Sequence, residues 1–198
     1  MVAAGVLTTI AIDASIRHGL DFLATIDERA GVFVGAAIVT IFAQLLQAPL
    51  LAGLWDEVVE PPLFAMGAAL VAGGAVAQIV SAAANVVLGA DLAGDALVSG
   101  DAALGSAVHD IADALFFVGN SLVGLGVLAV TWSSGRFRGR LLGGIAVVAA
   151  VANLAVYLAF ALEALWVIGA AGVTALAAWY AVAGAGLLRH PATPSPRT

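Results

Sequence analysis

The sequence contains no cysteine and no lysine, and charged side chains make up only 10% of its 198 residues. The absence of cysteine excludes disulfides, thiolate metal sites, iron–sulfur clusters and a cysteine nucleophile. The absence of lysine excludes a rhodopsin-like lysine linkage. All 7 basic residues are arginine, against 13 acidic ones. The net charge of −6 lacks the basic footprint of a nucleic-acid-binding protein, so no nucleic-acid partner is expected.

Apolar side chains dominate what is present. They form 63% of the chain, and the mean hydropathy is +1.10. A soluble domain averages roughly 45–50% apolar and about 25% charged residues. So few polar side chains cannot cover a surface in water, and such high apolar content also excludes intrinsic disorder. The sequence therefore predicts an all-α polytopic transmembrane helix bundle, with the lipid bilayer as its partner.

Long uncharged runs place the membrane spans. A spanning helix needs roughly 20 apolar residues, so the length allows five or six in one transmembrane domain, residues 1–188. Residues 141–188 carry one charge, Glu163, and are long enough for a hairpin that turns near Glu163 and Trp166. Residues 1–15 fit either a short first span, the sixth helix, or a segment outside the bilayer. The other expected spans are 31–55, 63–88, 111–132, 141–162 and 165–188, followed by a disordered tail, 189–198.

The segments between these spans carry most of the charge. Residues 15–29 have helically spaced apolar side chains among charged ones, which predicts an interfacial amphipathic helix or a helix extension. Pro49 should kink the end of the 31–55 span. Residues 89–108 contain three spaced aspartates and are expected to form a loop. These aspartates are Asp91, Asp95 and Asp101.

The arginines predict the threading. Short arginine-rich loops remain in the cytoplasm. The turn with Arg136, Arg138 and Arg140 is separated from Arg189 by two expected spans, which places both on one side. We therefore expect a multi-pass protein of the inner or plasma membrane with a cytoplasmic C-terminus. The aspartate-rich segment would then lie outside.

One stretch resembles a bacterial family. Residues 116–154 read FFVGNSLVGLGVLAVTWSSGRFRGRLLGGIAVVAAVANL, with an aromatic pair before Gly119 and a Ser-Gly turn before Arg140. This pattern is similar to the small bacterial membrane proteins of domain of unknown function 4386, over about residues 31–188. The resemblance implies six helices and a polar cluster entering this span, but no activity. The chain departs from it in its compressed first helix and in Ser121, where relatives are expected to carry a larger polar or histidine side chain.

A polar cluster near the start of the 111–132 span is the first candidate site. His109 and Asp113 are four residues apart and share a helix face, and Asn120 follows seven residues later on that face. An imidazole beside a carboxylate can bind an ion or relay protons. The alternative is that Asp110 and Asp113 simply suit the helix N-terminus as anions. No metal is predicted, and the cofactor stays unknown.

Intramembrane carboxamides form the second candidate. Gln78, Ser81 and Asn85 lie on one helical stripe, and Gln44 and Gln47 form a matching pair on the preceding helix. Because a lone polar group is expensive in lipid, we expect them to hydrogen-bond across helices. Alternatively they line a polar pocket for a small uncharged ligand. Asn153 and Tyr157, four residues apart, would contribute to the same interior.

Small residues indicate close helix packing rather than a site. Gly119, Gly124 and the pair Gly143–Gly144 lie within expected spans, where small side chains let helix backbones approach closely. We expect this to hold helices together without specifying a partner.

Three functions remain open. The preferred one is an uncharacterised structural or accessory membrane component, as a homo-oligomer or within a larger complex. The second is a small-solute or ion-handling protein with a polar cavity opening outside near His109 and Asp113. The third, an intramembrane enzyme using these two residues, is less favoured, because hydrolase, metalloprotease and phosphate-loop motifs are absent.

Overall fold

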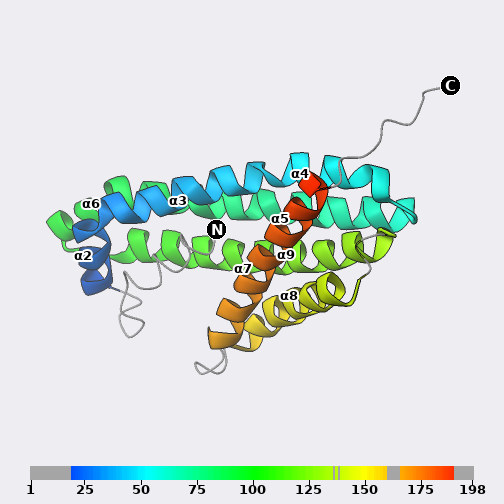
Figure 1. Ribbon diagram of the computed structural model, residues 1–198. Helices are drawn as coiled ribbons and strands as arrows, with labels where there is room; N and C mark the ends of the chain where they lie inside the picture. Colours follow the sequence, from blue (N-terminus) through cyan, green and yellow to red (C-terminus); the bar gives the residue numbers. More distant parts are fainter. Residues whose placement is uncertain (1–18, 136, 138, 160–165, 190–198) are drawn as a thin grey trace. The chain divides into compact units, whose positions relative to one another are not determined.

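The computed structural model describes residues 19–135, 137, 139–159 and 166–189 of the chain (Figure 1). Within these residues the fold is all-α and contains no strand, which confirms the predicted class. An isolated bridge joins Val58 to Ser134. The helices are α2 (Leu20–Glu28), α3 (Ala30–Leu45), α4 (Gln47–Leu54), η1 (Trp55–Glu57), α5 (Pro61–Val87), the π-helical η2 (Leu88–Leu92), α6 (Ala93–Ser99), α7 (Ala103–Ser133), α8 (Arg140–Ala159) and α9 (Trp166–Arg189).

Helices long and apolar enough to cross a membrane account for much of the described chain. The 4 candidates are Ala30–Glu57, Pro61–Ser99, Ala103–Ser133 and Ile168–Arg189. The apolar part of α8, Arg140–Ala155, is shorter. The helices are thus consistent with contact with a lipid bilayer. Residues 1–15, the turn at Glu163 and the tail 190–198, on which three expectations depended, lie outside the described residues.

The expected loop over residues 89–108 was wrong. The helix of α5 continues through η2 and α6 to Ser99, and α7 begins at Ala103. This segment contains no proline, so its spaced aspartates do not interrupt the helical backbone. The break is confined to a turn in which Gly100 adopts a φ of 73° and Asp101 Oδ1 accepts a hydrogen bond of 2.9 Å from the Ala103 N–H.

Pro49 was expected to kink the end of the 31–55 span, and the helix is interrupted shortly before it. Leu46 is a turn residue between α3 and α4, and α3 ends at Leu45, four residues before the proline. A proline clashes with the carbonyl group four residues earlier and offers no N–H to it. Gln44 lies near the end of α3 and Gln47 is the first residue of α4, on either side of this break.

The amphipathic segment before the first long helix is α2. Its Phe22, Leu23 and Ile26 are almost completely buried. They pack with Phe33 of α3 and Leu88 of η2 in one hydrophobic cluster. The apolar face of α2 therefore packs against the protein, and its charged residues are exposed.

The described chain forms two compact units. Unit 1 comprises residues up to Leu45 and Gly74–Asn120, and unit 2 comprises Leu46–Gly73 and the residues from Ser121 onward. Helices α5 and α7 contribute residues to both. The core of unit 1 is the hydrophobic cluster around α2. The core of unit 2 gathers side chains from α4, α5, α7, α8 and α9, among them Leu54, Phe64, Val127, Leu176 and Trp179.

Glycines bring α5 and α7 into close contact in each unit. In unit 1 a Cβ atom built on Gly119 would lie 2.8 Å from the carbonyl oxygen of Gly74. In unit 2 a Cβ on Gly126 would lie 2.6 Å from the carbonyl oxygen of Gly67. Gly119 therefore has the packing role expected from the sequence, whereas Gly144 has no neighbour within 4 Å of such a Cβ.

Candidate functional site

Three carboxamides from three helices form a hydrogen-bonded series inside unit 1, which we call the carboxamide chain. The Gln44 Nε2 group of α3 donates to Oε1 of Gln78 on α5. The Gln78 Nε2 group donates to Oδ1 of Asn120 on α7 at 3.2 Å. The Asn120 Nδ2 group donates to the Phe116 carbonyl at 3.0 Å. The three side chains therefore hydrogen-bond one after another across three helices.

Burial explains why these groups must be paired. Gln44, Gln78 and Asn120 are 2%, 0% and 2% exposed. A buried carboxamide without partners costs several kcal/mol in a medium that cannot hydrogen-bond. The neighbouring Gly119 lets α7 approach α5 closely enough for the Gln78–Asn120 hydrogen bond, because a Cβ there would lie 2.6 Å from Gln78 Cγ. The hydrogen bond between Gln78 and Asn120 thus depends on the glycine at position 119.

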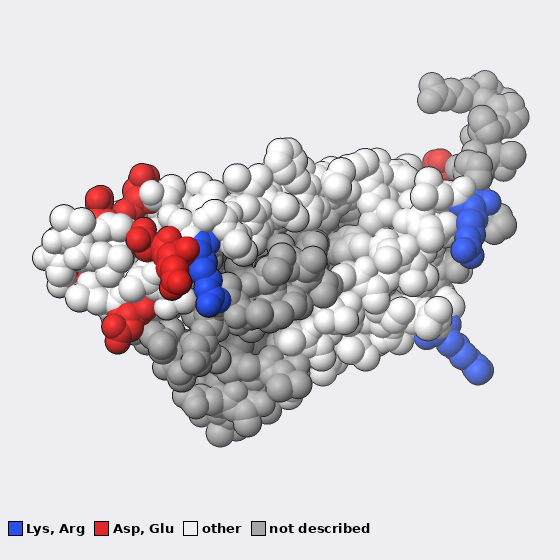
Figure 2. All heavy atoms as spheres, turned by 60° about the vertical axis from the view of Figure 1, so that its left-hand side comes forward, with Lys and Arg blue, Asp and Glu red and all other residues white. Residues whose placement is uncertain are grey.

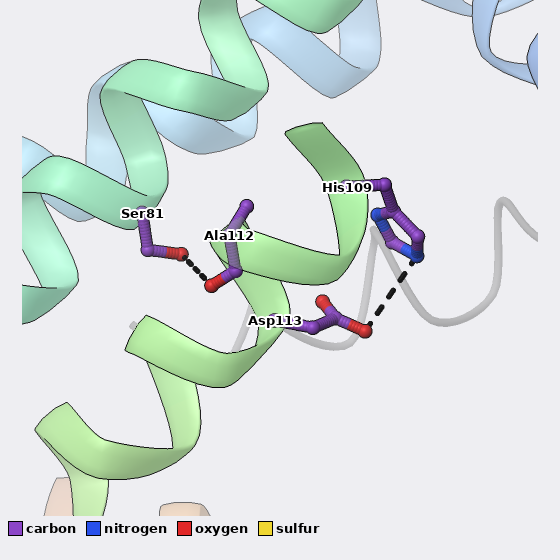
Figure 3. Close-up of polar contacts among 4 residues, drawn as sticks. All are labelled: Ser81, His109, Ala112 and Asp113. Carbon is purple, nitrogen blue, oxygen red and sulfur yellow. Dashed lines mark hydrogen bonds and ion pairs between the residues drawn. The ribbon is translucent and has the colours of Figure 1, made fainter. Parts of the chain in front are cut away.

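A second contact between α5 and α7 lies closer to the start of α7. The Ser81 hydroxyl of α5 donates to the Ala112 carbonyl of α7 at 2.7 Å (Figure 3). Ser81 is 2% exposed. Gln78 and Ser81, which share one stripe of α5, thus both contact α7. Asn85, on the same stripe, has a buried Oδ1 atom without a hydrogen-bond partner among the described residues.

His109 and Asp113 form the other candidate site. Their Nε2 and Oδ2 atoms lie 3.5 Å apart, and the two side chains are 13% and 44% exposed. Figure 3 shows this pair on the side of α7 away from Ser81. The ring of Phe22 from α2 packs on the imidazole, with the centroids 4.5 Å apart. The Nδ1 atom of His109 is buried and has no hydrogen-bond partner among the described residues.

Most of the described acidic residues belong to unit 1, as this pair does. Figure 2 shows acidic residues gathered together, with an arginine beside them. Within the described residues, no group of three or more His, Asp or Glu side chains has the arrangement of a metal site. The described acidic residues of this unit are Asp21, Asp27, Glu28, Asp91, Asp95, Asp101, Asp110 and Asp113.

The helix-terminus interpretation of Asp110 and Asp113 was wrong. Because α7 begins at Ala103, both residues lie beyond its first turn, where the helix dipole acts. Its 31 residues correspond to about 46 Å, which exceeds the roughly 30 Å of a hydrocarbon core. The first turns of α7 can therefore extend beyond the hydrocarbon region, where carboxylates remain hydrated.

The other predicted site residues do not connect the carboxamide chain and the His109–Asp113 pair into one site. Asn120 lies seven residues from Asp113, about 10 Å along the helix, and pairs with Gln78 instead. Gln47 is 4% exposed and belongs to unit 2. Asn153, also in unit 2, donates to the Ala149 carbonyl at 2.7 Å. The side chain of Tyr157 lies outside what the structure describes.

Cavities of appreciable volume occur in unit 2. One has a volume of about 450 Å³ and is lined by residues including Phe137, Leu142 and Arg189. The other has a volume of about 570 Å³ and lies between α8 and α9. Neither is lined by a member of the carboxamide chain or by His109. The cavity predicted at His109 and Asp113 is therefore not among them.

Two contacts were not predicted from the sequence. The Trp179 indole N–H of α9 donates to Thr131 Oγ1 of α7 at 2.8 Å, and both residues are fully buried. A tryptophan in an apolar helix does signal a need for an acceptor, but it does not identify which one. The packing of Phe22 on His109 depends on α2 folding against α7, and no local pattern specifies that contact.

Comparisons of this chain with protein-family models, with curated proteins and with solved structures found no match.

Proposed function

We propose that this chain is a polytopic integral membrane protein with a structural or accessory role, of the kind grouped as domain of unknown function 4386. The observation that carries the proposal is the carboxamide chain, in which Gln44, Gln78 and Asn120 hydrogen-bond one after another. Polar groups that bind a solute in a membrane usually face a water-filled cavity. Here their hydrogen-bonding capacity is directed to neighbouring helices instead.

A specific observation favours the second candidate, a solute- or ion-handling protein. The buried Nδ1 atom of His109 has no partner among the described residues, and its Nε2 atom faces Asp113. A proton or a small polar ligand could engage this imidazole. The packing of Phe22 over the ring leaves less room for such a ligand, and the exposed carboxylate of Asp113 remains hydrated. We therefore rank it second.

A native mass spectrum distinguishes the two roles. The full chain is purified in mild detergent and measured with and without a chelator, together with the Asp113→Ala variant. A structural role predicts a mass free of small polar ligands in all samples, either as this chain alone or with further protein subunits. A bound ion or solute that is lost with the chelator or in Asp113→Ala would overturn the proposal in favour of the second candidate.

The proposed topology has the C-terminus and Arg140 on the cytoplasmic side of a cell membrane, and Asp101 outside. The cysteine-free chain allows a direct test with single cysteines at the exposed positions Asp101 and Gly139, which flank α7. A membrane-impermeant maleimide applied to intact cells should label Asp101→Cys and spare Gly139→Cys until the cells are lysed. Labelling of Gly139→Cys alone in intact cells would indicate the opposite topology. Equal labelling of the two variants would show that α7 does not cross the membrane.

A further inference from the structure

The groove between α8 and α9 in unit 2 combines an apolar wall with one positive charge. Its volume is about 570 Å³. The lining is mostly aliphatic, and the hydroxyl of Thr174 in its wall donates back to the Ala170 carbonyl of its own helix at 2.8 Å. Its charged lining residue is Arg140 at the first position of α8. Other lining residues are Gly144, Val148, Ala171, Ala175 and Ala178.

The shape of the groove follows from small residues on both helices. A Cβ atom added to Gly144 would have no neighbour within 4 Å, and Ala171 and Ala178 are exposed. From Arg140 to Val148 the groove follows about 12 Å of α8 at the helical rise. An apolar chain can therefore lie along it, starting at the arginine and running toward the middle of the bilayer.

The position of Arg140 makes an anion the complementary group. The N-terminus of a helix carries a partial positive charge, and a cation there is unfavourable. Arg140 is exposed and forms no ion pair with a described carboxylate. Arg189, which lines the other cavity, differs because it lies in the last turn of α9, where a cation interacts favourably with the helix. Of these two described arginines, Arg140 is therefore the one whose position favours an external anion.

We propose that the groove between α8 and α9 binds one anionic phospholipid, with its phosphate at Arg140 and an acyl chain against Gly144, Val148 and Ala175. Basic pockets between transmembrane helices are known to accept anionic headgroups. The phosphate neutralises both the guanidinium and the end of α8, and the acyl chain covers apolar surface. This binding role goes beyond the proposed structural function and does not depend on it.

The test compares phosphatidylglycerol with phosphatidylcholine of the same acyl chains, added to the full chain in mild detergent and counted by native mass spectrometry. One arginine near an anionic lipid contributes about 1 kcal/mol, so the wild type should retain phosphatidylglycerol about fivefold more than phosphatidylcholine. Arg140→Gln should reduce this preference to about one. Arg29→Gln, which removes the same charge in unit 1, should leave it unchanged.

A second variant tests the groove itself. Gly144→Leu adds a larger side chain to the groove at a position where a Cβ meets nothing within 4 Å, and should lower retention of both lipids. An unchanged preference in Arg140→Gln, or equal loss in Arg29→Gln, would overturn the proposal. So would retention unaffected by Gly144→Leu, which would indicate unspecific lipid around the protein. Competition by inorganic phosphate alone would show a phosphate site and not a lipid site.

Discussion

Trp179 of α9 and Thr131 of α7 are joined by a hydrogen bond of 2.8 Å between two side chains that have no exposed surface. The Thr131 hydroxyl in turn donates to the Val127 carbonyl at 2.7 Å. One hydroxyl thus satisfies both an indole N–H and a carbonyl group of its own helix. This buried contact therefore connects α9 to α7 within unit 2 through a hydrogen bond between side chains.

Thr131→Val should destabilise the protein by about 1–3 kcal/mol, because it leaves the Trp179 N–H buried without an acceptor while keeping the side-chain shape. The measurement is the free energy of unfolding in detergent. Thr174→Val is the matched control, since the exposed Thr174 hydroxyl bonds only to the Ala170 carbonyl of its own helix. If both variants lose the same stability, the indole hydrogen bond is not what holds α9.

Much of the fold was accessible from the sequence because the apolar runs are long and lack charges. The helices predicted over 31–55, 63–88 and 165–188 correspond closely to α3–α4, α5 and α9. The segment 89–108 was predicted wrongly because spaced aspartates resemble a loop in composition. Residues with such aspartates can still be helical, because the helix satisfies their backbone N–H and carbonyl groups while the carboxylates reach water.

The candidate site was only partly predictable, because helical spacing specifies which residues share a face but not which residues meet between helices. Helical spacing correctly placed Gln78 and Ser81 on one face, because both belong to one regular helix. It could not identify Asn120 as the partner of Gln78, since that depends on how α7 packs against α5 at Gly119. Partners far apart in sequence are set by packing and not by periodicity.

Gln78→Leu should reduce the free energy of unfolding by about 1–3 kcal/mol, because the variant loses the central member of the carboxamide chain and its hydrogen bonds to Gln44 and Asn120. A double-mutant cycle with Asn120→Leu isolates the Gln78–Asn120 contact. Interhelical hydrogen bonds in membranes average about 0.6 kcal/mol, with a maximum of about 1.7, so the coupling should fall in this range. Additive losses with no coupling would show that the two carboxamides act independently.

Around His109, packing should outweigh charge. Asp113→Asn should change the free energy of unfolding by less than about 1 kcal/mol, because the carboxylate is nearly half exposed and its pairing is screened. Phe22→Ala should cost about 3–5 kcal/mol, since Phe22 is 1% exposed in the core of unit 1. Both are measured by denaturant titration in the same detergent. A larger loss in Asp113→Asn would indicate that the ion pair, and not the aromatic contact, positions the imidazole.

Gly119→Ala tests whether close backbone approach is what allows the carboxamide chain to form. The added Cβ would lie 2.6 Å from Gln78 Cγ and 2.8 Å from the Gly74 carbonyl oxygen, and backbone cannot move aside as a flexible side chain can. Overpacking of this kind costs about 1–3 kcal/mol. Gly35→Ala in α3 is the control, because its Cβ meets nothing within 4 Å and alanine favours a helix by about 0.5–1 kcal/mol over glycine. The two variants should therefore shift the unfolding free energy in opposite directions. A stabilised Gly119→Ala variant would mean that α5 and α7 separate freely at this point, and that the Gln78–Asn120 hydrogen bond does not require the glycine.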